Sequence, residues 1–289
     1  MKAGRMNRFK SLEKSKLVIL PRLHAHEAGK PILRLDKVTV AYESGKALDE
    51  ISFELQRGER LAVVGPNGAG KSTLFKVIAG VLHPTSGVVE VAGSQPDGHI
   101  CIAYVPQRSQ VDWNFPLQVR DVVMMGRVGK IGWLRRPTPK DHQIVRSALE
   151  TVGLQELADR QIGQLSGGQQ QRMFIARALA QEAELMLMDE PFAGLDVPAQ
   201  EELFRILDSL RTQGVTVMVA LHDLQTASER FDRVMLLNRR LIGLGSAEQI
   251  FTPEHLITAY GGHLRLIPSQ QGLIALGDTC CDEGEHDHL

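Results

Sequence analysis

A glycine-rich segment that ends in a lysine and two hydroxyl residues is the first part of the sequence that could carry chemistry. It reads Gly65-Pro66-Asn67-Gly68-Ala69-Gly70-Lys71-Ser72-Thr73 and fits the pattern G-x-x-x-x-G-K-[ST]. Glycines let backbone N–H groups converge on phosphate oxygens, and a following helix adds its positive end. Lys71 supplies a charge, and the Ser72 hydroxyl is placed to bind Mg²⁺. The segment predicts a nucleotide-phosphate site, which many enzyme classes share.

Two adjacent acids, Asp189 and Glu190, follow the apolar run Leu185–Met188. Asp189 would reach Mg²⁺ at the carboxyl end of a strand, whereas Glu190 is better suited to orient or deprotonate an attacking water. The start of a solvated loop is the alternative interpretation of such a pair taken alone. Because the phosphate segment lies upstream, we interpret the pair as part of a nucleotide-hydrolysing site.

A histidine and a glutamine end two further apolar runs. His222 follows Val215–Leu221, where an imidazole could contact the γ-phosphate and hold the water, although a lone histidine is more often structural. Gln107 follows Cys101–Val105 and offers a neutral amide that could sense Mg²⁺ or the water. The predicted catalytic residues are therefore Glu190, His222 and Gln107, and the predicted Mg²⁺ ligands are Ser72, Gln107 and Asp189.

A second anion site is predicted at the segment Leu165-Ser166-Gly167-Gly168-Gln169-Gln170-Gln171-Arg172. Ser166 is a suitable N-cap for a helix through Met173–Ala180, and the glycine pair exposes N–H groups at the positive helix end. A capped helix alone would not need two glycines.

Apolar spacing predicts the elements that position these groups. A period of two between Val38 and Leu55 indicates half-buried antiparallel strands, whereas the continuous apolar runs that precede the polar groups indicate parallel strands covered on both faces. Apolar residues at helical spacing in 144–152 and 203–210 predict helices between them. This alternation indicates one doubly wound α/β core, without an internal repeat.

Composition excludes several functions. The 289 residues are 43% hydrophobic and carry a net charge of −1, which argues against a general nucleic-acid binder. No apolar run approaches the roughly 18 residues of a membrane-spanning helix, and the basic N-terminus lacks the apolar stretch of a secretory signal. Three cysteines form no disulfide framework, as expected in a reducing cytosol.

In order along the chain, these motifs resemble those of the ATP-binding subunits of ABC transporters, over about residues 32–265. The resemblance implies an α/β fold: a P-loop NTPase core with a mainly parallel sheet, an antiparallel β subdomain and a helical subdomain that carries the ABC signature. It identifies Tyr42 as the aromatic that stacks on adenine, Gly65–Thr73 as Walker A, Gln107 as the Q-loop, Leu165–Gln169 as the signature, Leu185–Glu190 as Walker B, Ala193–Asp196 as the D-loop and His222 as the switch histidine.

The same resemblance implies an active ATPase that uses ATP and Mg²⁺. Two copies would enclose two ATP molecules, the signature helix of one copy capping the nucleotide on the P-loop of the other. The predicted nucleotide-binding residues are Tyr42, Gly65, Pro66, Asn67, Gly68, Ala69, Gly70, Lys71, Ser72, Thr73, Ser166, Gly167, Gly168, Gln169 and Asp196. Integral membrane permease subunits would hold the dimer at the cytoplasmic face of the cell membrane.

Several runs resemble the metal-ion importer branch of this family, closest to bacterial manganese import ATP-binding proteins: Val111–Pro116, Met125–Arg127, Gly132-Trp133 and Ala259–Gly262. The resemblance implies import of a divalent transition metal, manganese first and zinc or iron next, delivered by an extracytoplasmic metal-binding protein. Trp113 and Phe115 would line the groove that receives the permease, with a buried core role as the alternative. A soluble ABC ATPase such as an iron–sulfur assembly factor, or a non-enzymatic nucleotide sensor, would share the nucleotide motifs.

We expect three regions: a basic flexible extension at 1–30, an ABC ATP-binding domain at 31–268 with its helical subdomain at about 108–180, and an acidic tail at 269–289. The tail contains Cys280, Cys281, His286 and His288, which suggests a metal-sensing hypothesis because thiolates and imidazoles suit zinc. A disordered, solubilising end is the favoured interpretation of this segment.

Overall fold

A six-stranded sheet forms the centre of the computed structural model, which describes residues 30–96, 101–132, 134–261, 264–269 and 272–277. The strands run in the order β5-β6-β7-β3-β8-β9; the first five are parallel and β9 is antiparallel to β8. Their bounds are Ile102–Val105 (β5), Leu185–Asp189 (β6), Thr216–Leu221 (β7), Arg60–Val64 (β3), Arg233–Asn238 (β8) and Arg240–Gly245 (β9). The predicted parallel core is confirmed.

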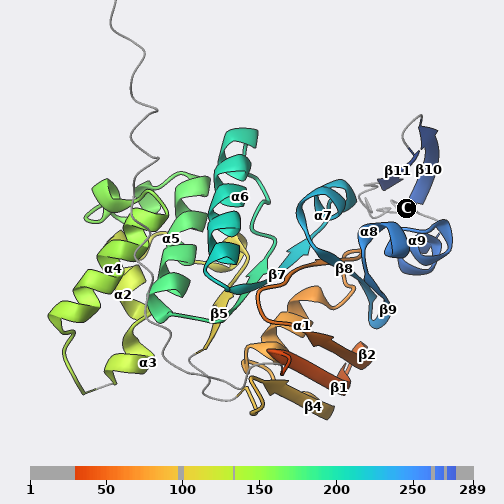
Figure 1. Ribbon diagram of the computed structural model, residues 1–289, viewed down its shortest axis with the longest axis horizontal. Helices are drawn as coiled ribbons and strands as arrows, with labels where there is room; N and C mark the ends of the chain where they lie inside the picture. The colour runs from red at the N-terminus through yellow and green to blue at the C-terminus, as the bar shows by residue number, and fades with distance from the viewer. Residues whose placement is uncertain (1–29, 97–100, 133, 262–263, 270–271, 278–289) are drawn as a thin grey trace, which may run out of the picture.

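A separate antiparallel sheet, in the order β2-β1-β4, packs below helix α1 (Figure 1). Its strands are Leu33–Tyr42 (β1), Gly45–Leu55 (β2) and Ser86–Val91 (β4). The prediction of antiparallel strands from the period-two pattern is confirmed. Two further strands, Leu264–Ser269 (β10) and Gly272–Gly277 (β11), form an antiparallel pair near the end of the described chain.

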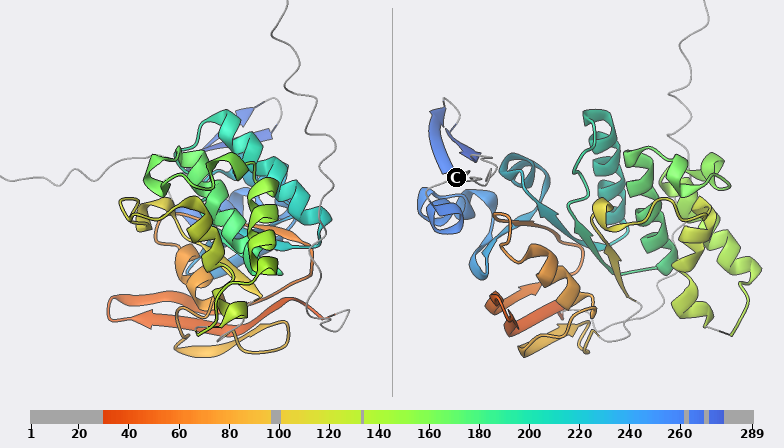
Figure 2. Two further views of the ribbon diagram at one scale, coloured as in Figure 1. Left: turned by 90° about the vertical axis from the view of Figure 1, so that its left-hand side faces the viewer. Right: turned by 180° about the vertical axis from the view of Figure 1, so that it is seen from behind.

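The helices divide into two groups (Figures 1 and 2). At one end of the molecule lie Val119–Met125 (α2), Val128–Ile131 (α3), Pro139–Thr151 (α4) and Gly167–Gln181 (α5), and 3-10 turns at Arg108–Gln110, Gln155–Leu157 and Ile162–Gln164 accompany them. The others are Lys71–Ile78 (α1), Val197–Thr212 (α6), Leu224–Arg230 (α7), Ala247–Ile250 (α8) and Pro253–Tyr260 (α9). The apolar stripes predicted in 144–152 and 203–210 are the buried faces of α4 and α6.

Two hydrophobic cores cover opposite faces of the central sheet, which explains why its strands are apolar throughout. Side chains of β3 alternate between them: Ala62 and Val64 join the core under α2, α4, α5 and α6, whereas Leu61 and Val63 join the core formed with α1 and the antiparallel sheet. The sheet is therefore held rigid from both sides, and its strand ends are fixed relative to one another.

Candidate functional site

The polar groups predicted from the sequence lie at the carboxyl ends of four neighbouring strands. The phosphate loop follows β3, His222 follows β7, Asp189 ends β6 with Glu190 directly after it, and Gln107 lies just beyond β5. Since these strands are parallel and adjacent in the order β5-β6-β7-β3, all four ends meet at one edge of the sheet. Such an edge is where open α/β sheets bind ligands.

Close packing requires two of the loop glycines. A Cβ on Gly65 would lie 2.0 Å from the carbonyl oxygen of Leu237 in β8, and one on Gly70 would lie 2.5 Å from that of Ala47 in β2. Gly70, with φ 96°, also occupies the left-handed region where it caps α1. The loop is thus clamped between two strands, and the first turn of α1 follows it with free N–H groups.

Lys71 is buried at the start of α1, with 6% of its surface exposed. Its Nζ donates to the carbonyl oxygens of Gly65 (2.7 Å) and Pro66 (3.2 Å). Burial lowers the pKa of Lys71, and the nearby carboxylates of Glu190 and Asp189 oppose that shift. The positively charged ammonium group of Lys71 is therefore suited to bind the negatively charged phosphates of a nucleotide. The other predicted phosphate-binding residues, Asn67, Gly68, Ala69, Ser72 and Thr73, lie in the same loop and helix turn.

Asp189 is almost completely buried, with 1% of its surface exposed. The Tyr104 hydroxyl donates to its Oδ2 at 3.4 Å, and the Ser72 hydroxyl lies beside the carboxylate. Within the described residues, Oδ1 is buried without a hydrogen-bond partner. Burial raises the pKa of Asp189. A carboxylate with an unsatisfied oxygen beside a hydroxyl supplies the hard oxygen ligands that Mg²⁺ prefers, so the residues fit this cation.

Glu190 directly contacts both other predicted catalytic residues. Gln107 Nε2 donates to its Oε2 at 2.8 Å, and His222 Nε2 hydrogen-bonds its Oε1. Glu190 also has a φ of 50°, an uncommon conformation for a residue with a side chain and one that is often found at functional sites. The Gln107 amide nitrogen is directed to Glu190, so a role of Gln107 at the cation stays a prediction.

The signature segment begins α5 as predicted. Ser166 Oγ accepts from the backbone N–H of Gln169 (3.3 Å), and Gln169 Oε1 accepts from the N–H of Ser166 (2.9 Å), which forms a capping box. A Cβ on Gly168 would lie 2.9 Å from Cβ of Ala199 in α6, and one on Gly167 would lie 2.8 Å from the Arg108 guanidinium. Internal packing therefore accounts for part of the glycine requirement.

Two predicted nucleotide-binding residues lie on the surface rather than in the strand-end cluster. Tyr42 ends β1 and is 50% exposed, so its ring is accessible to a base. Asp196 caps α6 and accepts from the N–H of Ala199 at 3.2 Å. The structure brings Gln107, Glu190 and His222 together and Ser72 to Asp189, whereas Ser166 and Asp196 cap their own helices.

Tyr104 is a residue of this cluster that motif reasoning missed. It lies on β5, pairs in register with Leu187 of β6 and contacts Asp189 through its hydroxyl. Burial, followed by the charge of Asp189, raises the pKa of Tyr104, so the phenol remains a hydrogen-bond donor. The signal available in the sequence was a tyrosine in an otherwise apolar strand directly before Gln107.

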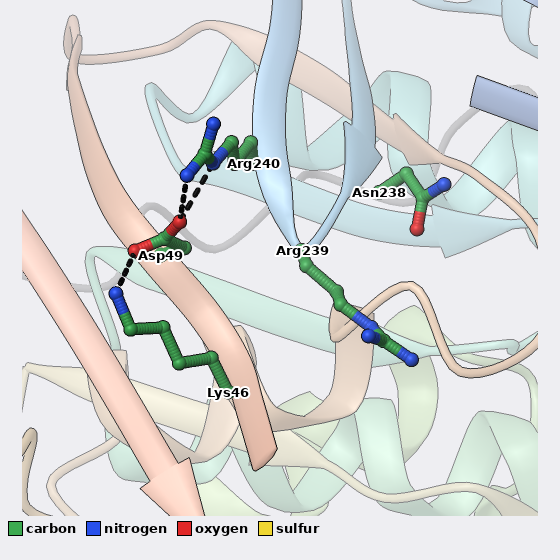
Figure 3. Close-up of a pocket in the computed structure, with 5 residues that line it drawn as sticks. All are labelled: Lys46, Asp49, Asn238, Arg239 and Arg240. Carbon is green, nitrogen blue, oxygen red and sulfur yellow. Dashed lines mark hydrogen bonds and ion pairs between the residues drawn. The ribbon is translucent and has the colours of Figure 1, made fainter. Parts of the chain in front are cut away.

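A cavity of about 440 Å³ lies between β2 and the β8–β9 turn (Figure 3), lined by Lys46, Asp49, Asn238, Arg239 and Arg240. Hydrogen bonds from Lys46 and Arg240 lower the pKa of Asp49. The backbone N–H of Arg239 donates to the carbonyl of Ala69 in the phosphate loop (2.8 Å), and its carbonyl accepts from the N–H of Asp49 (2.7 Å). This cluster therefore braces the loop.

The aromatic residues predicted to meet a permease have different exposures. Trp113 packs edge-on against Phe174 at 5.8 Å between ring centroids and donates to the Arg108 carbonyl, whereas Phe115 is 57% exposed. Trp133 lies outside the described residues. Phe115 is thus an aromatic side chain of this segment that is open to a partner.

In the described ranges, no helix combines the length and apolar character needed to cross a bilayer. These same ranges contain no group of three or more His, Cys, Asp or Glu side chains arranged for a metal ion. The basic extension up to residue 29 and the cysteine- and histidine-containing end of the tail lie outside them.

Comparison with known proteins supplies the family. The pattern of the ABC transporter family matches residues 48–193. The manganese transport system ATP-binding protein MntB of Bacillus subtilis is 48% identical over 81% of this chain and 94% of its own length. The zinc transport system ATP-binding protein TroB of Treponema pallidum is 47% identical over 80% of this chain and 88% of its own length.

A solved structure, an inward-facing conformation of a metal-chelate type ABC transporter, agrees with the fold. It superposes with a TM-score of 0.74 at 30% identity and covers 86% of this chain and 99% of its own. The resemblance inferred from the ordered motifs is confirmed, and so is the fold class inferred from it. The phosphate loop and the Walker B strand both lie within the matched residues 48–193, and the chain is a member of the ABC transporter family, as an ATP-binding subunit.

Proposed function

We propose that this chain hydrolyses ATP at the strand-end cluster. Lys71 and the N–H groups of the phosphate loop hold the triphosphate. Glu190 accepts a proton from the attacking water, and Gln107 and His222 fix its carboxylate in the required orientation. Mg²⁺, held by Ser72 and Asp189, would neutralise charge that develops on the phosphate oxygens. The observation that carries this proposal is the hydrogen bonding of Glu190 by both Gln107 and His222.

A second copy of the chain would complete each site. Ser166, Gly167 and Gly168 begin α5 at a helix end that attracts anions, and Tyr42 offers an accessible ring for adenine. Asp196 begins α6 beside the same segment. In this arrangement ATP binding closes the dimer and hydrolysis reopens it, a ligand-driven population shift.

We further propose that the ATPase energises import of a divalent transition metal, with manganese favoured over zinc or iron. Names of its relatives support this, because similar chains belong to manganese and zinc transport systems. The partners would be integral membrane permease subunits and, through them, an extracytoplasmic metal-binding protein. The protein would then work at the cytoplasmic face of the membrane, with residues 31–268 as the ATP-binding domain and about 108–180 as its helical subdomain.

Docking to a permease can be tested at Phe115. We expect Phe115→Glu to abolish co-purification of integral membrane subunits from the native host while the basal ATPase rate of the isolated chain is kept. Val88→Glu, at another exposed apolar residue (49% exposed) in the antiparallel sheet, is the matched control and should keep both. Recovery of an integral membrane partner with Phe115→Glu at the wild-type yield would contradict the docking proposal.

The transported metal can be tested by deletion of the gene. Growth of the deletion strain should fail under manganese limitation and recover when the wild-type gene, but not the Glu190→Gln variant, is returned. A growth defect confined to zinc limitation or to iron limitation would instead identify that metal as the transported ion. Unimpaired growth under all three limitations would contradict metal import.

A further inference from the structure

Tyr104 places a phenol beside the acid proposed to hold the cation. Strands β5 and β6 are parallel neighbours with Tyr104 opposite Leu187 and Val105 opposite Met188. Side chains two residues apart share one face of a strand, so Asp189 lies on the face of Leu187, toward the core that Tyr104 packs against. The Tyr104 hydroxyl donates to Oδ2 of Asp189 at 3.4 Å.

This contact leaves the two carboxylate oxygens of Asp189 in different environments. Oδ2 accepts from the phenol, whereas Oδ1 is buried and has no hydrogen-bond partner among the residues that the structure describes. A buried oxygen without a partner destabilises the folded protein unless a ligand satisfies it. A donor that fixes one oxygen also fixes the direction of the other, as the hydrogen-bonding partners of metal ligands commonly do.

Tyr104 is itself held in place. The Arg177 guanidinium, from the signature helix α5, donates to the backbone carbonyl of Tyr104 at 2.9 Å. The strand is paired with β6 along its full length from Ile102 to Val105. The phenol therefore reaches Asp189 from a rigid strand rather than from a loop.

We infer that Tyr104 is a positioning residue for the Mg²⁺ site: its hydroxyl orients the Asp189 carboxylate so that Oδ1 points to the cation. The inference rests on the proposed function, since it concerns the cation used there. It assigns Tyr104 no contact with ATP. Its loss should weaken the Mg²⁺-dependent part of ATP binding and leave the Mg²⁺-independent part intact.

The chain offers a matched control for this test. Tyr260 is a second tyrosine whose hydroxyl is buried, and within the described part of the chain that hydroxyl has no hydrogen-bond partner. Replacing tyrosine by phenylalanine removes one oxygen and keeps the ring at both positions. Tyr104→Phe and Tyr260→Phe therefore differ in whether the lost hydroxyl contacts Asp189.

The experiment measures binding of a fluorescent ATP analogue to the full-length wild type and to both variants, first in EDTA and then across a Mg²⁺ titration. For Tyr104→Phe we expect the Mg²⁺ concentration for half-maximal tightening to rise about three- to tenfold, with affinity in EDTA unchanged. Tyr260→Phe should match the wild type in both measurements. Thermal unfolding of each variant checks that it is folded.

Three outcomes would overturn the inference. Tyr104→Phe could have the same Mg²⁺ requirement as Tyr260→Phe, or it could lose affinity equally in EDTA and in Mg²⁺, which would indicate a purely structural role. If the wild type bound the nucleotide with no dependence on Mg²⁺, the proposed function would fail, and the positioning role of Tyr104 would fail with it. That last result is visible before any variant is made.

Discussion

Two of the regions in which the described chain buries an acidic side chain differ in the environment they give it. In the helical region, Glu182 at the end of α5 is paired with Arg127 and Lys130. Burial alone would raise the pKa of Glu182, but hydrogen bonds from Lys130 and Arg127 outweigh it and lower that pKa. At the strand ends, Asp189 accepts from the neutral hydroxyl of Tyr104, and burial raises its pKa.

This difference distinguishes the charge cluster around Glu182, which is structural, from the cluster around Asp189, which is suited to bind a ligand. Arg127 also pairs with Asp141 (3.0 Å) and donates to the carbonyl of Ala180 (2.9 Å), so it joins α4 to the end of α5. The charges there are paired with one another through Oε2 of Glu182, while its Oε1 is buried without a hydrogen-bond partner among the described residues. Around Asp189 and Lys71 the hydrogen-bond partners are hydroxyls and backbone carbonyls, and a cation and a polyphosphate would complete the balance.

The largest effect is expected for Glu190→Gln. Loss of a general base typically lowers a rate by 10²- to 10⁴-fold, so we expect steady-state ATP hydrolysis to fall about 10³-fold while the free energy of unfolding changes little. Colorimetric phosphate release and urea unfolding measure the two quantities. A variant that kept the wild-type rate would remove Glu190 from the mechanism.

Glu182→Ala should have the opposite effect, lowering stability while leaving nucleotide binding unchanged. Removal of one member of a buried ion pair leaves Arg127 and Lys130 without this partner, and we expect the free energy of unfolding to fall by about 3 kcal/mol. The folded variant should retain its affinity for ATP, which equilibrium dialysis can measure. If the folded variant also lost affinity for ATP, the helical cluster would not be purely structural, and the two regions would not differ as described.

The pH dependence of that loss gives a finer test. Because the pKa of Glu182 is lowered in the folded state, its stabilisation is present above the ordinary value of 4.5 and is lost as the pH falls through the folded-state pKa. The stability difference between the wild type and Glu182→Ala should therefore shrink below about pH 4.5. A difference that grew toward acid pH would contradict the sign of the shift.

Gly126→Ala should destabilise the helical region by a smaller amount. A Cβ at this residue, which ends α2, would lie 2.2 Å from the carbonyl oxygen of Arg177 in α5. The two helices must separate to admit it, which we expect to cost about 2 kcal/mol. Urea unfolding of the wild type and this variant measures the effect.

The smallest expected effect is on the reactivity of the Cys101 thiol, which lies outside both clusters. Burial, with the charge of Glu184, raises the pKa of the Cys101 thiol to about 11. At pH 8 about one thiol in a thousand would be ionised, so alkylation at this residue should be slow in the folded protein and rapid in denaturant. Peptide mapping after iodoacetamide treatment measures it. Rapid labelling of the folded chain at Cys101 would contradict its burial.

The strand-end site was predictable because each of its groups ends an apolar run. Continuous runs before Gly65, Gln107, Asp189 and His222 identify parallel strands, and parallel strands bring their carboxyl ends to one edge. The strand order was not readable from those runs, so the direct contacts of Glu190 with Gln107 and His222 emerge only in the structure.

The helical region was less predictable. Apolar spacing in 144–152 indicates the buried face of α4, but Arg127, Asp141 and Glu182 are far apart in sequence and follow no motif. Charged residues are ordinarily expected at the surface, so burial of three of them depends on helix packing that spacing alone does not fix. Tyr104 escaped notice for a related reason, because its partner lies on a neighbouring strand.

One measurement tests the shared ATP site most directly: the mass of Glu190→Gln in solution, by light scattering, with Mg²⁺-ATP. We expect the mass of two chains, and of one chain after EDTA is added. Adding Ser166→Arg to this variant should keep ATP bound while preventing the second copy from closing over it, so the mass should remain that of one chain. A single-chain mass for Glu190→Gln with Mg²⁺-ATP, or unimpaired pairing with Ser166→Arg, would contradict a site completed by the signature helix of a second copy.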